Sequence, residues 1–179
     1  VMGGTHNKGE FSMSTEGIFQ IALILATFLC SLVAGFLFAF ALVVMPGIQS
    51  LNDREFIRAF QVMDRIIQNN QPIFVLVWVG SVVVLVTSAV LGIGQLDGAG
   101  HLLIIFASLA YIFGVQLPTF TINVPLNNKL QTLDVDNMNE TTYKAARIDF
   151  EPRWNLWNSI RTPFACLTSA LLIILLFRL

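Results

Sequence analysis

Four long apolar segments, separated by polar stretches, form the main pattern along this chain. They cover residues 17–45, 72–94, 101–120 and 160–179. Each reaches or nearly reaches the ~20 apolar residues that an α-helix needs to cross the ~30 Å hydrocarbon core of a bilayer. None contains Asp, Glu or Lys, and Arg occurs only near the ends of the last segment, at Arg161 and Arg178. A charge at the centre of such a helix costs about 2.5–3.5 kcal/mol on insertion, so the pattern predicts four transmembrane helices.

The composition also indicates an integral membrane protein. Of the 179 residues, 55 % are hydrophobic and only 12 % are charged, whereas soluble domains are about 25 % charged. The net charge of −1 provides no basic surface for phosphates, which argues against nucleic acid as a partner. We predict an all-α membrane protein with a polar N-terminal tail at residues 1–16 and a single four-helix transmembrane domain at residues 17–179. The tail lacks the basic start of a signal peptide, which favours a retained first span.

The lengths of the connections predict how the four spans are arranged in the lipid bilayer. The short, glycine-containing link at residues 95–100 makes spans 2 and 3 antiparallel neighbours. An even number of spans places both termini on one side, so the two long connections form a polar cap on the other. The basic residues on the cap side are Arg54, Arg58, Arg65, Lys129, Lys144, Arg147, Arg153 and Arg161. The positive-inside rule predicts that the cap faces the cytoplasm. We expect the membrane to be a bacterial inner membrane.

The connection between spans 1 and 2 has the pattern of an amphipathic helix. Asn52 followed by Glu55 is typical of a capping box at a helix start. Apolar residues then recur at spacings of 4, 3 and 4, and they are Phe56, Phe60, Met63 and Ile67. Asn69, Asn70 and Pro72 end the pattern. Two interpretations are open: a lid over a pocket, or a helix resting at the lipid interface.

Polar residues continue along one face past the end of the third span. Gln116, Thr119, Asn123 and Asn127 recur at spacings of 3, 4 and 4. Pro118 and Pro125 interrupt the hydrogen-bond ladder of a helix at this point. We therefore predict a broken helix end that presents amide side chains, with an ordinary Asn-capped terminus as the alternative.

A second polar cluster opens the fourth span. In a helix, Trp154, Trp157, Asn158 and Arg161 share one face. Interfacial tryptophans are common in membrane proteins, but an arginine just inside an apolar run, at the positive end of its helix dipole, is not. We expect Arg161 to be held by a carboxylate, by backbone carbonyls or by an anionic ligand. Since Asn123 and Asn127 approach from the same side of the membrane, the two clusters are predicted to meet.

Small residues form faces at which helices can approach closely in lipid. They are Thr27, Ser31, Gly35 and Ala39 in the first span, and Gly80, Ser88 and Gly92 in the second. Packing inside the bundle and a homodimer interface are both open as their use. Cys30 and Cys166 are predicted at different depths, too far apart for a disulfide, and we expect both to be small buried apolar residues.

The order of these features resembles the anthrone oxygenase-like family of four-span membrane proteins. The strings Asn123-Val-Pro-Leu-Asn127 and Trp154-x-x-Trp157-Asn158-x-x-Arg161 carry the resemblance, which covers roughly residues 18–175. It implies an oxygenase that uses O₂ to oxidise a hydrophobic small molecule, an apolar aromatic such as an anthrone, to a quinone. It also implies a pocket built from both strings. On this hypothesis Arg161, Asn123 and Asn127 are catalytic, and Trp154, Trp157, Asn158 and Gln116 bind the substrate.

Two other functions are open on the sequence alone. Motifs of zinc peptidases, P-loop enzymes, dinucleotide-binding enzymes and α/β-hydrolases are absent. Histidine occurs only at His6 and His101, so a haem b would be held by His101, in a dimeric protein for electron transfer or redox sensing. His101, however, is predicted at the opposite membrane face from the Asn/Trp/Arg cluster. The third hypothesis is a bundle without enzymatic activity that acts through partner proteins.

Overall fold

The structure is a computed structural model that describes residues 14–179, and every regular element in this range is a helix. In chain order these are α1 (Thr15–Ala39), η1 (Phe40–Val44), α2 (Met45–Gln49), α3 (Asp53–Gln68), α4 (Pro72–Gly92), α5 (Gly98–Tyr111), η2 (Ile112–Gln116), η3 (Thr119–Asn123), α6 (Val124–Gln131) and α7 (Glu140–Leu176). The η elements are π-helical turns.

Four continuous helical stretches are long and apolar enough to cross a membrane. They are Thr15–Gln49, Pro72–Gly92, Gly98–Gln131 and Glu140–Leu176. The predicted fold, an all-α protein with four transmembrane helices, is confirmed, and the protein is a multi-pass membrane protein. Most of the predicted tail at residues 1–16 lies outside the described residues.

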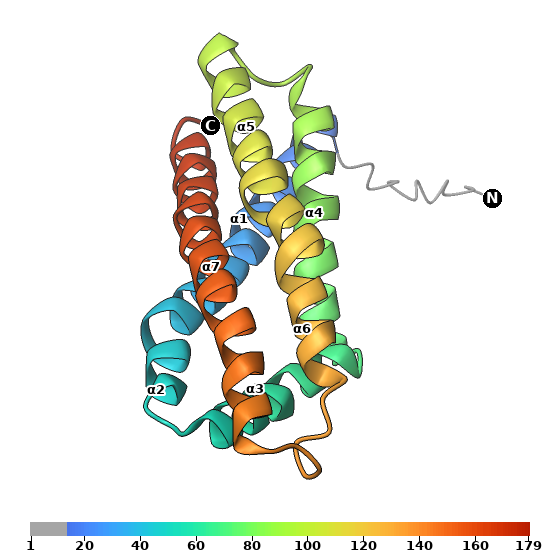
Figure 1. Ribbon diagram of the computed structural model, residues 1–179. Coiled ribbons are helices and arrows are strands. Elements are labelled where there is room, and N and C mark those ends of the chain that lie inside the picture. The colour runs from blue at the N-terminus through green and yellow to red at the C-terminus, as the bar shows by residue number, and fades with distance from the viewer. Residues whose placement is uncertain (1–13) are drawn as a thin grey trace, which may run out of the picture.

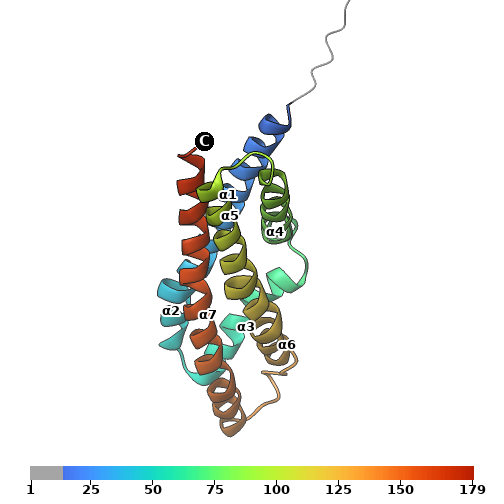
Figure 2. The same cartoon turned by 90° about the horizontal axis from the view of Figure 1, so that it is seen from above.

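The long helices α1, α4, α5 and α7 run side by side, with α1 against α4 and α7, and α5 against α7 (Figure 1). The short α4–α5 link and the C-terminus lie at one end of the bundle. The helix α3 crosses the other end, where α6 and the start of α7 also lie (Figures 1 and 2). The cap that the sequence predicts is therefore at this second end.

Apolar and small side chains fill the interior of the bundle. Leu23 and Leu172 are fully buried, and so is Ala165. Gly114 is a point of close approach, because a Cβ there would collide with the ring of Phe164 on α7. The outer faces of all four spanning helices expose large apolar side chains, which suits a surface in contact with lipid.

Each of the three π turns is followed, two residues after its end, by a proline. The prolines are Pro46, Pro118 and Pro125. A proline ring in an α-helix collides with the carbonyl four residues before it, and the wider π turn makes room for the ring. The prediction of a broken end to the third span is therefore corrected: the helix passes through η2 and η3 and continues to Gln131.

The connection between the third and fourth spans is shorter than the sequence suggests. Only residues 132–139 separate α6 from α7. Asn139 caps α7, and its side chain accepts a hydrogen bond of 2.9 Å from the backbone N–H of Thr142. Pro152, which is typical of a helix start, lies inside α7. The polar cap is thus built mainly from α3 and from helical extensions of the spans.

The predicted amphipathic helix is present as α3. Asn52 caps it, since its Oδ1 accepts a hydrogen bond of 2.9 Å from the Glu55 N–H. Phe56 and Phe60 are buried on its inner face, while Val62 on the outer face is 56 % exposed. The helix therefore covers the bundle and still presents apolar surface outward.

The small-residue faces serve packing inside the bundle, at least in part. Gly80 approaches Leu29 of α1, and Gly92 approaches Phe19. The first-span face divides, because Thr27 is buried whereas Gly35 is exposed. Cys30 is buried, as predicted. Cys166 on α7 is exposed, so the prediction of a buried cysteine is wrong there.

Candidate functional site

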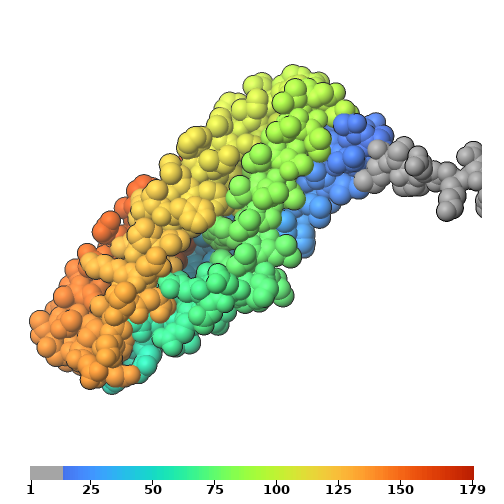
Figure 3. Space-filling model, turned by 90° about the vertical axis from the view of Figure 1, so that its right-hand side faces the viewer, coloured from blue at the N-terminus to red at the C-terminus, as the bar shows by residue number. Residues whose placement is uncertain are grey.

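A cavity of about 190 Å³ lies where the bundle meets the cap. Its apolar wall comes from α1, η1, α3, α4, η3, α6 and α7 and consists of Phe36, Leu37, Phe40, Phe60, Met63, Ile67, Phe74, Trp78, Phe120, Val124 and Trp154. Its polar lining consists of Asp64, Thr119, Asn123, Asn127, Asn158 and Arg161. Figure 3 shows the surface hollowed between the start of α4 and the orange segment of α6. Since α3 forms part of the wall, its placement supports the lid interpretation.

Arg161 is the most unusual residue of this lining. It is 3 % exposed, and it lies in the middle of α7 and not at a helix start, so the predicted conflict with the helix dipole does not exist. Its Nη1 donates to Thr119 Oγ1 at 2.8 Å and its Nη2 to Asn158 Oδ1 at 2.9 Å. Its Nε has no hydrogen-bond partner. No Asp or Glu among residues 14–179 forms an ion pair with it.

Hydrogen bonds of Asn123 and Asn127 with Trp154 join the Asn cluster of the third span to the Trp/Arg cluster of the fourth. Trp154 Nε1 donates to Asn127 Oδ1 at 2.8 Å, and Asn123 Nδ2 donates to the Trp154 carbonyl at 3.3 Å. The Arg161 guanidinium lies 5.7 Å from the centroid of the Trp154 ring. The buried Oδ1 of Asn123 is unpaired. The predicted meeting of the Asn cluster with the Trp/Arg cluster therefore occurs in the structure.

Asp64 is a cavity residue that the sequence analysis missed as a site residue. It is 4 % exposed. Its carboxylate accepts hydrogen bonds from Asn127 Nδ2 (2.8 Å), Gln68 Nε2 (2.7 Å) and Gln131 Nε2 (3.0 Å). Burial raises the pKa of this carboxyl group above its ordinary value, although the three amide donors act in the opposite direction. A signal for it exists in the sequence, because Asp64 lies four residues after Phe60 and three before Ile67, on the apolar face of α3.

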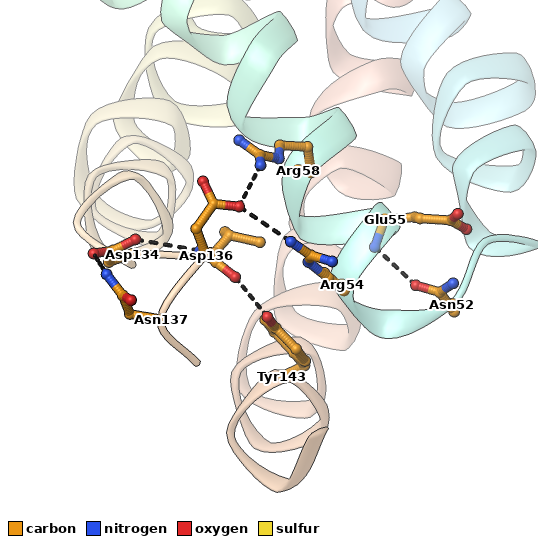
Figure 4. A network of polar contacts seen from close by, with 9 residues as sticks. Asn52, Arg54, Glu55, Arg58, Asp134, Asp136, Asn137 and Tyr143 are labelled. Atoms are coloured by element: carbon orange, nitrogen blue, oxygen red, sulfur yellow. Dashed lines mark hydrogen bonds and ion pairs between the residues drawn. The ribbon is translucent and has the colours of Figure 1, made fainter. Parts of the chain in front are cut away.

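The outer part of the cap holds α3 in place through charged contacts away from the cavity. Asp136 accepts hydrogen bonds from both Arg54 (3.1 Å) and Arg58 (2.6 Å), as Figure 4 shows. These side chains are about half exposed. Tyr143 of α7 donates to the carbonyl of Val135, which fixes the same loop. This network positions the lid and contributes no atom to the cavity wall.

Three residues predicted for the site lie outside the cavity wall. Gln116 is buried behind it, where its Oε1 accepts a hydrogen bond of 3.0 Å from Nε1 of the wall residue Trp78. Trp157 is partly exposed at the edge of the helix face that carries Trp154. His101 lies near the α4–α5 link at the opposite end of the bundle, and its Nε2 is 3.1 Å from the Ile93 carbonyl oxygen. His101 therefore does not line this cavity and is not placed to ligate a haem in it.

Comparison with known proteins identifies the family of this chain. A family model described as "Anthrone oxygenase" matches residues 60–171, more than half of the chain. The chain belongs to the anthrone oxygenase family. No curated protein and no solved structure matches it.

The part of the chain that matches the anthrone oxygenase family contains the whole polar lining of the cavity. It begins at Phe60 on α3 and ends at Leu171 on α7. The α1 and η1 residues of the apolar wall lie before it. The matched range therefore includes both charged residues of the cavity lining, Arg161 and Asp64.

Proposed function

We propose that this protein oxidises a planar, apolar aromatic substrate of the anthrone type with O₂, producing a quinone and water. The observation that carries the proposal is Arg161, a buried guanidinium with an unpaired Nε, which lines a cavity whose apolar wall is mostly aromatic. A charged side chain within a membrane bundle is costly and marks a functional site by default. The family membership of the chain supports the same reaction.

The cavity suits a flat aromatic ligand with one polar edge. Aromatic side chains make favourable stacked and edge-to-face contacts with aromatic rings, and Trp154 and Phe60 already pack edge to face with centroids 5.5 Å apart. The polar groups gather at Arg161, Asn123 and Asn158, where they can bind the oxygen of the substrate. The volume of about 190 Å³ is smaller than the ~300–1,000 Å³ typical of pockets for drug-sized ligands. It favours a compact molecule of two or three fused rings.

The proposed chemistry balances without a further reactant. Loss of a proton from the methylene carbon of an anthrone sends an electron pair to the carbonyl oxygen, where the guanidinium stabilises the developing anion. This electron-rich anion reduces O₂ and forms a carbon–oxygen bond, and the resulting peroxide takes up one proton. Loss of the second methylene proton with cleavage of the O–O bond leaves the quinone and one water. One O₂ is consumed for each quinone formed.

A substrate of this kind dissolves in the bilayer, and an opening between two of the apolar helical stretches would admit it from there. The hollow in Figure 3 opens between α4 and α6, and Phe120 at this wall is 61 % exposed. We propose lateral entry of the substrate from lipid, with its carbonyl group leading toward Arg161.

The test uses the purified full-length chain in lipid nanodiscs with anthrone under air. We expect the loss of anthrone, the appearance of anthraquinone absorbance and the uptake of one equivalent of O₂, all faster than in empty nanodiscs. Equal rates with and without the protein, for anthrone and for hydroxylated anthrones, would reject the proposal. The absorbance spectrum of the same sample tests the haem alternative, because a bound haem has an intense Soret band. If the band is present, the variant His101→Ala tests whether His101 ligates the haem.

A further inference from the structure

Of the residues in the described range 14–179 that line the cavity, Asp64 is the only one with a carboxylate. Within residues 14–179, no Lys, Arg or His forms an ion pair with it. Its three partners are neutral amides, one from its own helix α3 and two from α6. An ionised carboxylate has about four lone-pair sites, so three amide donors leave capacity for one more hydrogen bond.

A purely structural role explains this arrangement poorly. The bonds to Asn127 and Gln131 do join α3 to α6. However, a buried charge without a counter-ion is costly, and an amide or hydroxyl could join two helices at a lower cost. The cap uses paired charges elsewhere, for example Asp136 with two arginines. The position of Asp64 in the cavity wall is what distinguishes it from those residues.

We propose that Asp64 is the general base that removes the methylene proton of the substrate, an assignment that rests on the proposed function. Both the base and the oxyanion site are connected to one tryptophan, Trp154. Asn127 accepts a hydrogen bond from Trp154 Nε1 and donates one to Asp64 Oδ1, so it fixes the carboxylate relative to the ring. Arg161 approaches the same ring, 5.7 Å from its centroid.

Two charged groups along one ring suit the substrate class. In an anthrone the carbonyl carbon and the methylene carbon occupy opposite positions of the central ring. We expect a molecule that lies along Trp154 with its oxygen at Arg161 to direct its methylene carbon away from the guanidinium and toward Asp64, which lines the same cavity. The two charged side chains of the cavity thus act at the two ends of one conjugated system.

The surroundings also make Asp64 a better base than an exposed aspartate. The groups that face it are neutral amides from α3 and α6, and the charged group on the α7 side of the cavity is Arg161. Burial raises its pKa, and a base with a higher pKa takes a carbon-bound proton more readily. Asp64 gains the first proton and returns it to the peroxide. It then takes the second methylene proton and delivers it to the hydroxide released from the O–O bond, which becomes water.

The deprotonation step can be measured without O₂. Anthrone is incubated anaerobically in D₂O with the full-length protein in nanodiscs, and mass spectrometry follows deuterium entering the methylene group. We expect exchange well above that of empty nanodiscs for the wild type and for the control Glu55→Gln, an exposed residue on the same helix. Asp64→Asn should lose about 10²-fold or more of the excess rate, the range of general base catalysis.

The possible results distinguish a failure of the Asp64 assignment from a failure of the proposed oxidation. If the wild type oxidises anthrone in air while Asp64→Asn exchanges deuterium at the wild-type rate, Asp64 is not the base and the proposed function stands. If the wild type does not oxidise any anthrone, both proposals fail. The wild type alone provides a second readout that does not depend on the folding of a variant. Its exchange rate should reach a plateau above the pKa of Asp64, whereas a rate that rises in proportion to hydroxide would overturn the assignment.

Discussion

Two arginines of the same helix, Arg147 and Arg161 of α7, differ in the partners that compensate their charge. Arg147 donates to Glu151 (2.6 Å), to Asp53 (3.0 Å) and to the carbonyls of Leu51 and Gln49 (both 2.8 Å). Its guanidinium also lies 4.4 Å from the centroid of the Phe56 ring. Arg161 is more deeply buried, yet it has two neutral partners, no carboxylate and a free Nε.

The difference separates a structural cation from one available to a ligand. The hydrogen bonds of Arg147 connect α7 to the turn between α2 and α3, so its charge is compensated within the protein and secures the cap. The charge of Arg161 is compensated only in part, since its buried Nε is unpaired, and the residue lines the cavity. Burial without a counter-ion lowers stability, and we take this cost as the sign of a site that binds an anionic or polarised oxygen.

The largest expected effect is the loss of activity in Arg161→Met. Removal of one donor that stabilises an oxyanion costs about 10²–10³-fold in rate. Since an apolar residue of similar length replaces a buried, poorly paired charge, the melting temperature should stay equal or rise. Anthrone oxidation and thermal unfolding in the same detergent measure the two effects. Arg153→Met, at an exposed position of the same helix, is the control and should retain full activity.

The opposite result is expected for Arg147→Met. This change leaves Glu151, whose side chain is 11 % exposed, without its cation, and breaking such a buried pair costs about 3 kcal/mol. The melting temperature should fall clearly, while the remaining folded protein keeps its turnover rate. Lys129→Met is the matched control, because its ion pair with Asp149 is exposed and worth under about 1 kcal/mol. Equal melting temperatures of Arg147→Met and Lys129→Met would contradict a structural role of Arg147.

The pH dependence of the rate tests Asp64, the other charged residue of the cavity lining. Asp64 acts as a base only when ionised, and burial raises its pKa. The value of kcat/KM should therefore be constant at high pH and fall about tenfold per pH unit below the pKa of Asp64. The fall should begin at a higher pH than for an ordinary aspartate. A profile with no acid limb above the ordinary aspartate range would contradict the assignment.

A smaller effect distinguishes the two tryptophans that the sequence groups together. Trp154→Phe keeps a ring in the cavity but removes the hydrogen bond to Asn127, a loss of about 1 kcal/mol or fivefold in kcat/KM. Trp157→Phe should leave the kinetics unchanged, because Trp157 does not line the cavity. Similar losses in both variants would mean that the substrate extends beyond this cavity.

The sequence predicts the membrane fold well because hydrophobic length alone determines it. It also predicts α3 and its cap, since Asn52 and the 4-3-4 spacing are local signals. The helix face of Asn123 and Asn127 follows from spacing as well. The position of Arg161 within its helix could not be predicted, because Pro152 is typical of a helix start and α7 nevertheless begins at Glu140. The spacing of Asp64 from Phe60 and Ile67 places it on the apolar face of α3, but only its long-range contacts with α6 show that its carboxylate is held at the cavity.

Oxidation of anthrone under ¹⁸O₂ by the protein in nanodiscs tests the central claim most directly. The account predicts a quinone that carries one ¹⁸O atom, the other atom of O₂ appearing in water, with a rate at least about 10²-fold lower in Arg161→Met. Labelled quinone formed at the same rate by the wild type, by Arg161→Met and by empty nanodiscs would contradict it.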